Sequence, residues 1–264
     1  MGSDKALMPL LFVGHGSPMN AIEENEFVDG WRKMSAAIPR PEAILCVSAH
    51  WETKGSHVTA MEWPATIHDF GGFPRSLYEI EYPAPGNPGL AKDTIANIKS
   101  TVLGQDFNWG LDHGSWSVLH RMYPAADIPV IQMSLDYTKP SQAHYDLAKE
   151  LSFLRRKGIL IIGSGNIVHN LRLVDWSKVD VPEFGFDWAL EADKKVKQLI
   201  LDGDHKSLIG FRSQGRAFDL AIPTPEHFLP LLYILALKEE NEPLEFFNDR
   251  AVMGSLTMTS VRIG

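Results

Sequence analysis

The sequence predicts an α/β layer fold in one compact domain, because strand-like and helix-like stretches alternate along it. Three short apolar runs, within residues 10–16, 43–51 and 159–169, each lead into a histidine framed by Gly, Ser or Ala. Such runs are typical of strands that are buried on both faces of a sheet. No low-complexity linker or repeat period interrupts the pattern. We therefore expect a single domain over residues 1–264.

Six segments have the composition of strands, being either apolar throughout or alternately apolar and polar. They are residues 9–13, 43–48, 57–61, 128–135, 159–162 and 254–263. The last segment alternates over most of its length, so we expect it to form a half-exposed strand.

Four helices are predicted between these strands, at residues 87–104, 141–157, 186–201 and 228–237. The first begins with Asn87 and Pro88, a capping side chain followed by a proline at the first helical position. The second has its leucines on one face, and we expect it to end before Gly158.

Residues 62–89 follow neither a helical nor a strand period and are dense in Pro, Gly and aromatic residues. Long irregular segments inside compact domains are often functional, and this one carries enough aromatic rings to line a pocket. An ordered surface loop packed by its own rings is the alternative, and the sequence leaves both open.

Composition narrows the class of protein. A net charge of −8 argues against a nucleic-acid-binding protein, which would carry a basic face. The single cysteine, Cys46, excludes an internal disulfide and a cysteine-rich zinc site, so any metal must be held by His, Asp or Glu. No run approaches the ~18 apolar residues of a membrane span, and the first residues lack a signal-peptide core. We expect a cytoplasmic protein with no membrane partner.

The histidines that follow the strands are the strongest candidates for a functional site. Ligands bind beyond the carboxyl ends of the strands in α/β sheets, so His15, His50 and His169 can meet there. His15 lies between two glycines and His50 follows small residues, which favours a role as metal ligands for both. His169 follows a Gly-Ser-Gly-Asn turn and suits either a ligand or an acid–base group.

Three further histidines are weaker candidates on local chemistry. His227 is adjacent to Glu226, and usually only one of two neighbours points at a given site, so the choice between them stays open. His113 lies beside a glycine in a predicted turn. It could support the metal ligands from outside the metal's own shell or act as a catalytic base. His68 is a candidate for substrate contact. We interpret His57, His120, His144 and His205 as structural.

Two other motifs carry less weight. Gly163-Ser164-Gly165 resembles half of a dinucleotide-binding fingerprint, but the third glycine is missing. No Gly-x-Ser-x-Gly elbow accompanies the serines near histidines. Clustered histidines without that elbow favour a metal site over a serine nucleophile.

Seven motifs, taken together and in order, resemble the DOPA 4,5-extradiol dioxygenase family, a branch of the LigB-like, class III ring-cleaving dioxygenases. The similarity is greatest to the zinc-associated bacterial branch. The motifs are Gly14-His15-Gly16-Ser17-Pro18-Met19, Val47-Ser48-Ala49-His50-Trp51, Ile67-His68-Asp69-Phe70-Gly71-Gly72-Phe73-Pro74, Tyr82-Pro83-Ala84-Pro85-Gly86, Asp112-His113-Gly114-Ser115-Trp116, Gly165-Asn166-Ile167-Val168-His169-Asn170-Leu171 and Pro223-Thr224-Pro225-Glu226-His227.

This resemblance implies a single α/β domain with a central mixed β-sheet flanked by helices, and one divalent metal per chain. It implies His15, His50 and His227 as ligands, with His227 rather than Glu226 at the third position. It implies His169 as a fourth ligand or the catalytic acid–base group, and His113 as its partner in catalysis. The aromatic loop is expected to contact the substrate through four residues: His68, Phe70, Phe73 and Tyr82.

The activity implied is extradiol cleavage of a catechol such as L-DOPA, with O2 and the catechol as the small-molecule partners. Zn²⁺ is expected in the isolated protein and Fe²⁺ for dioxygenase activity, since an all-histidine site suits both ions. Two other functions stay open: a zinc-dependent hydrolase at the same site, and a metal-binding protein of this fold without enzymatic activity.

Overall fold

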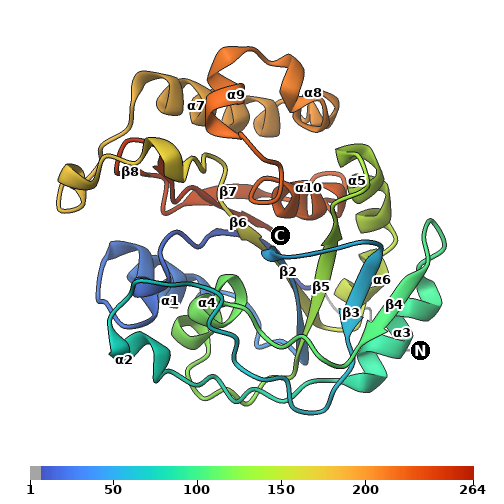
Figure 1. The fold of residues 1–264 in the computed structure, drawn as a ribbon. Coiled ribbons are helices and arrows are strands. Elements are labelled where there is room, and N and C mark those ends of the chain that lie inside the picture. The colour runs from blue at the N-terminus through green and yellow to red at the C-terminus, as the bar shows by residue number, and fades with distance from the viewer. Residues whose placement is uncertain (1–6) are drawn as a thin grey trace.

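The computed structural model describes residues 7–264, and an eight-stranded mixed sheet lies at its centre (Figure 1). The order of the strands is β4-β3-β5-β2-β6-β1-β10-β7. Strands β5, β2, β6 and β1 run parallel to one another. The antiparallel pairs are β3 with β5, β10 with β1, and β7 with β10. The bounds are β1 Leu10–Gly14, β2 Ala43–Thr53, β3 Ser56–Thr59, β4 Leu103–Asp106, β5 Val130–Asp136, β6 Ile159–Gly165, β7 Leu244–Phe247 and β10 Ser260–Ile263. A separate ribbon pairs β8 Ala251–Val252 with β9 Leu256–Thr257. The predicted mixed sheet is confirmed.

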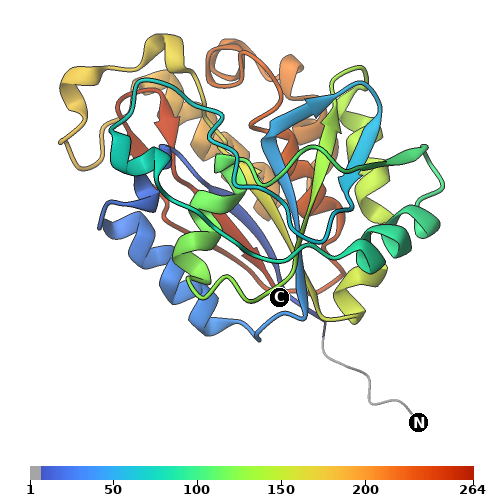
Figure 2. The ribbon, with the colours of Figure 1, turned by 60° about the horizontal axis from the view of Figure 1, so that its bottom comes forward.

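Helices cover both faces of this sheet, as predicted, and Figures 1 and 2 show them on its two sides. Their bounds are α1 Glu26–Ala37, α2 Arg75–Tyr78, α3 Pro88–Asn97, α4 His113–Met122, α5 Ser141–Lys149, α6 Ser152–Arg156, α7 Asp187–Leu201, α8 His205–Ile209, α9 Arg216–Ala221 and α10 Leu229–Ala236. Four short 3₁₀ turns lie at Pro18–Ala21, Leu171–Leu173, Trp176–Lys178 and Phe211–Ser213. No helix within residues 7–264 is long and apolar enough to cross a membrane. The first residues, where we expect no signal-peptide core, lie outside the described part.

The central strands are apolar throughout because successive side chains enter two different cores. In β1, Leu10 and Phe12 pack with α5, α7 and α10, whereas Leu11 and Val13 pack with α1 and α4. The same alternation recurs in β2 and β6. Side chains that point to opposite faces of a strand produce this division, and both faces are sealed from water.

The first predicted helix is shorter than expected. Helix α3 begins at Asn87 and Pro88 as predicted, since the Asn87 side chain accepts a hydrogen bond from the Leu90 N–H, but the helix ends at Asn97 rather than near residue 104. The backbone turns extended at Ile98, and Leu103–Asp106 then forms strand β4 beside β3.

Two other predicted elements are each divided in two. The helix expected over 141–157 breaks between α5 and α6, and Gly158 follows with a positive φ. The strand expected over 254–263 separates into β9 and β10, and β10 enters the main sheet between β1 and β7. The expectation of a half-exposed strand is therefore wrong: β10 is buried apart from partly exposed Arg262, and Val261 and Ile263 pack into the core.

The aromatic segment expected over 62–89 is an ordered loop as far as residue 87, with α2 as its one helical turn. Its backbone is held to the segment before α4 by Ile67 N–H donating to the Leu111 carbonyl at 2.8 Å. The indole N–H of Trp116, on α4, donates to the Ile67 carbonyl at 2.8 Å. The loop is therefore tied to the start of α4, which positions its rings near His113, the first residue of that helix.

Candidate metal centre

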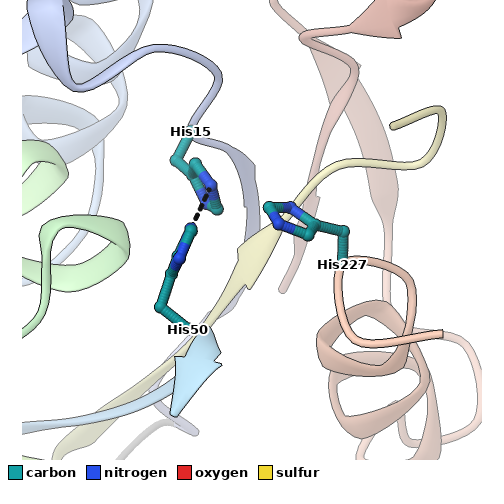
Figure 3. Close-up of side chains that lie close together, drawn as sticks. All are labelled: His15, His50 and His227. Carbon is teal, nitrogen blue, oxygen red and sulfur yellow. Dashed lines mark hydrogen bonds between the residues drawn. The ribbon is translucent and has the colours of Figure 1, made fainter. Parts of the chain in front are cut away.

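Three histidines from distant segments converge beyond the carboxyl ends of the central strands (Figure 3). His15 follows β1, His50 lies in β2, and His227 precedes α10. One ring nitrogen from each lies within 4.8 Å of the other two. The Nε2 atoms of His15 and His50 are 3.1 Å apart.

The sheet brings His15 and His227 together through β6. Strands β1 and β6 are parallel neighbours, with Gly14 opposite Gly165, and the His15 N–H donates to the Gly165 carbonyl at 3.1 Å. The next N–H, that of Asn166, donates to the His227 carbonyl at 3.0 Å. A Cβ atom on Gly165 would lie 2.1 Å from that same carbonyl oxygen. Only glycine therefore lets the His227 segment lie this close to the strand.

An irregularity in β2 positions His50. Between Val47 and Glu52 the strand advances five residues while its partner β5 advances two, from Met133 to Leu135. Such bulges are common next to active sites, where they redirect a side chain. The extra residues turn the His50 imidazole toward His15, although the chain remains in strand β2.

All three imidazoles are held in the neutral form. Burial, followed by repulsion from the neighbouring histidines, keeps the pKa of His15 and His227 well below the ordinary value of 6.5. Burial and the neighbouring His113 lower the pKa of His50 to about 3, against an opposing effect of Asp69. At neutral pH each ring therefore has one nitrogen without a proton, the form that binds metals.

The donor set fits a divalent cation. The Ser164 hydroxyl donates to the Gly114 carbonyl, so its oxygen accepts from Nδ1–H of His15 at 3.0 Å and leaves Nε2 of that ring unprotonated. Nδ1 of His227 is buried and has no hydrogen-bond partner within residues 7–264. Two imidazole nitrogens bound to one ion at about 2.0–2.1 Å would lie roughly 3.0–3.4 Å apart. The His15–His50 separation of 3.1 Å falls within that interval.

His169 lies directly against the cluster but outside the group of three. Its ring stacks on that of His227, with the centroids 3.4 Å apart and an interplanar angle of 8°. It belongs instead to a second group with His227 and Glu226, whose candidate ligand atoms also lie within 4.8 Å of one another. Burial, with a smaller effect of His113, lowers the pKa of His169 to about 4.

His113 begins helix α4 rather than lying in a turn, because the Asp112 side chain caps the helix through the Ser115 N–H. Its ring centroid is 3.9 Å from that of His50 and 5.8 Å from that of His15. The structure thus places His113 beside the three-histidine group, with Nδ1 directed at Asp69, 2.9 Å away.

The four loop residues predicted to contact substrate occupy different positions. Phe70 lies edge-on to His113, with the ring centroids 5.5 Å apart, and Phe73 packs behind it at 5.4 Å. His68 contacts Phe70 and uses Nε2 to hydrogen bond to the Ile80 carbonyl at 3.0 Å. Tyr82 is buried and donates its hydroxyl to the Tyr123 carbonyl at 3.1 Å. The structure therefore brings Phe70 to the histidines and leaves Tyr82 in the core.

Three polar residues around the cluster were given no role in the site by sequence reasoning. Asp69 and Ser164 contact histidine nitrogens, and fully buried Asp112 accepts hydrogen bonds from the side chains of Ser48 and Gln132. Burial and nearby Asp69 raise the pKa of Asp112 to about 6. The Asp-x-x-Ser pattern at Asp112 is a capping signal that could have revealed α4. Nothing local marks Asp69, whose hydrogen-bonding partner lies 44 residues away.

Comparison with known proteins gives consistent results across the chain. Residues 9–263 match the family model described as the catalytic LigB subunit of aromatic ring-opening dioxygenase. A protein of Escherichia coli (strain K12) named 4,5-DOPA dioxygenase extradiol is 46% identical over 97% of this chain and 95% of its own length. A Beta vulgaris protein of the same name is 35% identical over 98% and 100%, respectively. The crystal structure of an uncharacterized E. coli K12 protein superposes with a TM-score of 0.84 and 41% identity, covering 97% of this chain and 100% of that one.

Proposed function

This chain belongs to the LigB family of aromatic ring-opening dioxygenases, and we propose that it cleaves a catechol such as L-DOPA at the 4,5 position, next to the diol. Catechol and O2 are then its small-molecule partners, and residues 1–264 form one catalytic domain. The observation that carries the proposal is the set of three neutral histidines whose nitrogens lie within 4.8 Å of one another. Relatives named 4,5-DOPA dioxygenase extradiol, aligned over nearly the whole chain, support it.

In this proposal His15, His50 and His227 hold one divalent ion. When bound, that ion would supply Lewis acidity toward the catechol oxygens and, as Fe²⁺, the redox chemistry with O2. Zn²⁺ binds such imidazole sites as well as or better than Fe²⁺, so we propose zinc in the isolated protein and iron in the active enzyme. The fixed tautomer of His15 supports its assignment, because Nε2 is then available for the ion.

His169 is proposed to exchange a proton with the substrate. Its ring lies against His227 but outside the group of three, which favours an acid–base role over a fourth ligand. With a pKa of about 4 it is neutral at pH 7, and a ring nitrogen can accept the proton that a catechol hydroxyl loses on binding. His113, whose ring centroid is 3.9 Å from that of His50, is positioned to assist this transfer.

The aromatic loop is proposed to hold the ring of the catechol. Phe70 is in ring contact with His113, and Phe73 and Tyr78 support it from behind, at centroid distances of 5.4 and 5.1 Å. Packed aromatic rings exclude water from one side of the site and favour a flat substrate. His68 and Tyr82 contribute by fixing the loop, through their hydrogen bonds to the Ile80 and Tyr123 carbonyls.

Oxygen consumption by reloaded protein tests the proposal. Metal-stripped protein is reloaded anaerobically with Fe²⁺ or Zn²⁺ and given L-DOPA in aerated buffer, with ¹⁸O2 in a parallel sample. We expect oxygen uptake and a yellow product carrying both ¹⁸O atoms only with Fe²⁺. His15→Ala should abolish the reaction, whereas His120→Ala, on the partly exposed face of α4, should retain it. If neither metal gives oxygen uptake with L-DOPA or with a panel of simpler catechols, ring cleavage is refuted. That result would favour a hydrolase or a non-enzymatic metal-binding protein.

A further inference from the structure

Asp69 joins two of the histidines that belong to different parts of the site. It lies in the loop between β3 and α2, and its side chain is 17% exposed. One carboxylate oxygen, Oδ2, is 3.3 Å from Nδ1 of His50. The other, Oδ1, is 2.9 Å from both the backbone nitrogen and Nδ1 of His113. A single carboxylate therefore contacts a proposed metal ligand and a proposed catalytic group.

Asp69 is ionised at neutral pH despite its partial burial. Its Oδ1 accepts from the His113 backbone N–H, a donor that cannot change its role, and aspartate side chains ordinarily titrate with a pKa of about 3.9. The positive end of the α4 helix dipole, where the His113 N–H lies, also favours a negative charge. An ionised carboxylate only accepts hydrogen bonds.

His113 presents Nδ1–H to Oδ1 of Asp69, because the carboxylate can only accept. The negative charge on Oδ2, 3.3 Å from Nδ1 of His50, favours the same tautomer in that ring. An imidazole that carries its single proton on Nδ1 has an unprotonated Nε2. Nε2 of His50 faces Nε2 of His15, 3.1 Å away, and the hydrogen bond drawn between them in Figure 3 needs a proton on one of the two. A bound cation takes the place of that proton, because the hydrogen bond to Ser164 leaves Nε2 of His15 unprotonated and Asp69 favours the same state in His50.

We infer that Asp69 is a positioning residue that fixes the tautomers of His50 and His113, so that one ring presents Nε2 to the metal and the other presents Nε2 to the substrate. This inference rests on the proposed function for the roles of the two rings. Asp69 does not itself bind the ion, although His50, Asp69 and His113 form a group with ligand-like spacing. Its Oδ1 already accepts two hydrogen bonds from His113, and its Oδ2 lies against Nδ1 of His50.

The variant Asp69→Asn separates the two contacts. The asparagine oxygen would stay with the two donors of His113, because the backbone N–H there cannot change its role. The amide NH2 would then face Nδ1 of His50, which must become an acceptor and move its proton to Nε2. We expect zinc affinity to fall 10–100-fold, the usual cost of losing a hydrogen-bond partner of a ligand. Glu62→Gln, at an exposed carboxylate in the same loop, is the matched control and should bind zinc like the wild type.

Two readouts decide the inference, and neither needs catechol or O2. Competition with a chromophoric chelator measures zinc affinity, and long-range ¹H–¹⁵N spectra of the zinc-loaded wild type show which nitrogen of each ring is protonated. Nδ1–H on both His50 and His113, with the expected loss in Asp69→Asn, supports the inference. A proton on Nε2 of His113, zinc on Nδ1 of His50, or unchanged affinity in Asp69→Asn would overturn it. If Asp69→Asn fails to fold, the wild-type spectrum alone decides. Failure of ring cleavage with these readouts as expected would reject the proposed function and leave Asp69's role intact.

Discussion

Replacing Gly165 by alanine should damage the metal site although it replaces none of the proposed ligands. The added Cβ would lie 2.1 Å from the His227 carbonyl oxygen, whereas real Cβ atoms essentially never come within 3.0 Å of another atom and rarely within 3.4 Å. The His227 backbone must therefore retreat by 0.9–1.3 Å. Metal–ligand distances tolerate only about 0.2 Å, and β6 cannot give way because β1 and β2 hold both of its edges. We expect zinc affinity to fall by at least about 100-fold, comparable to the cost of a 1 Å misplacement in an active site.

Chelator competition on folded protein measures this loss, with circular dichroism as a check on the fold. Gly89→Ala is the matched control, because its Cβ would meet no atom closer than 3.4 Å and its site in α3 favours alanine. The control should bind zinc like the wild type. A folded Gly165→Ala protein with wild-type affinity would show that His227 is not held against β6 as a ligand.

Three further changes probe other parts of the account. Ser164→Ala removes the acceptor of His15 Nδ1–H, so zinc affinity in chelator competition should fall 10–100-fold, and an unchanged affinity would contradict the tautomer assigned to His15. For His169, a folded pKa of about 4 against 6.5 means that its contribution to stability is full above pH 6.5 and is lost as the pH falls toward 4. Urea unfolding of metal-free protein should therefore show that the wild type loses about 2–3 kcal/mol more than His169→Gln between pH 7.5 and 4.5; equal losses would refute this. Arg155→Met leaves the Glu242 carboxylate and the Met8 and Leu237 carbonyls without their buried donor. It should lower the free energy of unfolding in urea by about 3–5 kcal/mol while zinc affinity stays unchanged, and a smaller loss would show that the ion pair is not structurally required.

The central strands were predictable because burial on both faces gives an apolar run of strand length. Strand β4 was not, since Leu103 is its one buried residue and only pairing with β3 makes the segment a strand. Helix α1 was missed although Asn25 carries a capping signal, with its side chain accepting from the Phe27 and Val28 N–H groups. The break of the predicted helix between α5 and α6 likewise has no clear marker in the local sequence.

The candidate site also contains residues that the sequence predicts and residues that it does not. His15 and His50 could be proposed from the small residues around them at strand ends, since those frames leave room for a ligand. The choice between Glu226 and His227 needed more than local chemistry, because it depends on how the segment packs against Gly165. Asp69 could not be assigned, since its contacts with two histidines arise from a loop without any period. Contacts of that kind become visible only in the folded chain.

Locating the bound metal tests the central claim most directly. Crystals grown without oxygen and loaded with Fe²⁺ would give an anomalous-scattering peak that marks the ion. We predict one peak per chain, bonded to Nε2 of His15 and of His50 and to a ring nitrogen of His227. A peak among His50, Asp69 and His113, or among His169, Glu226 and His227, would contradict the assignment, because these two groups have similar ligand spacing.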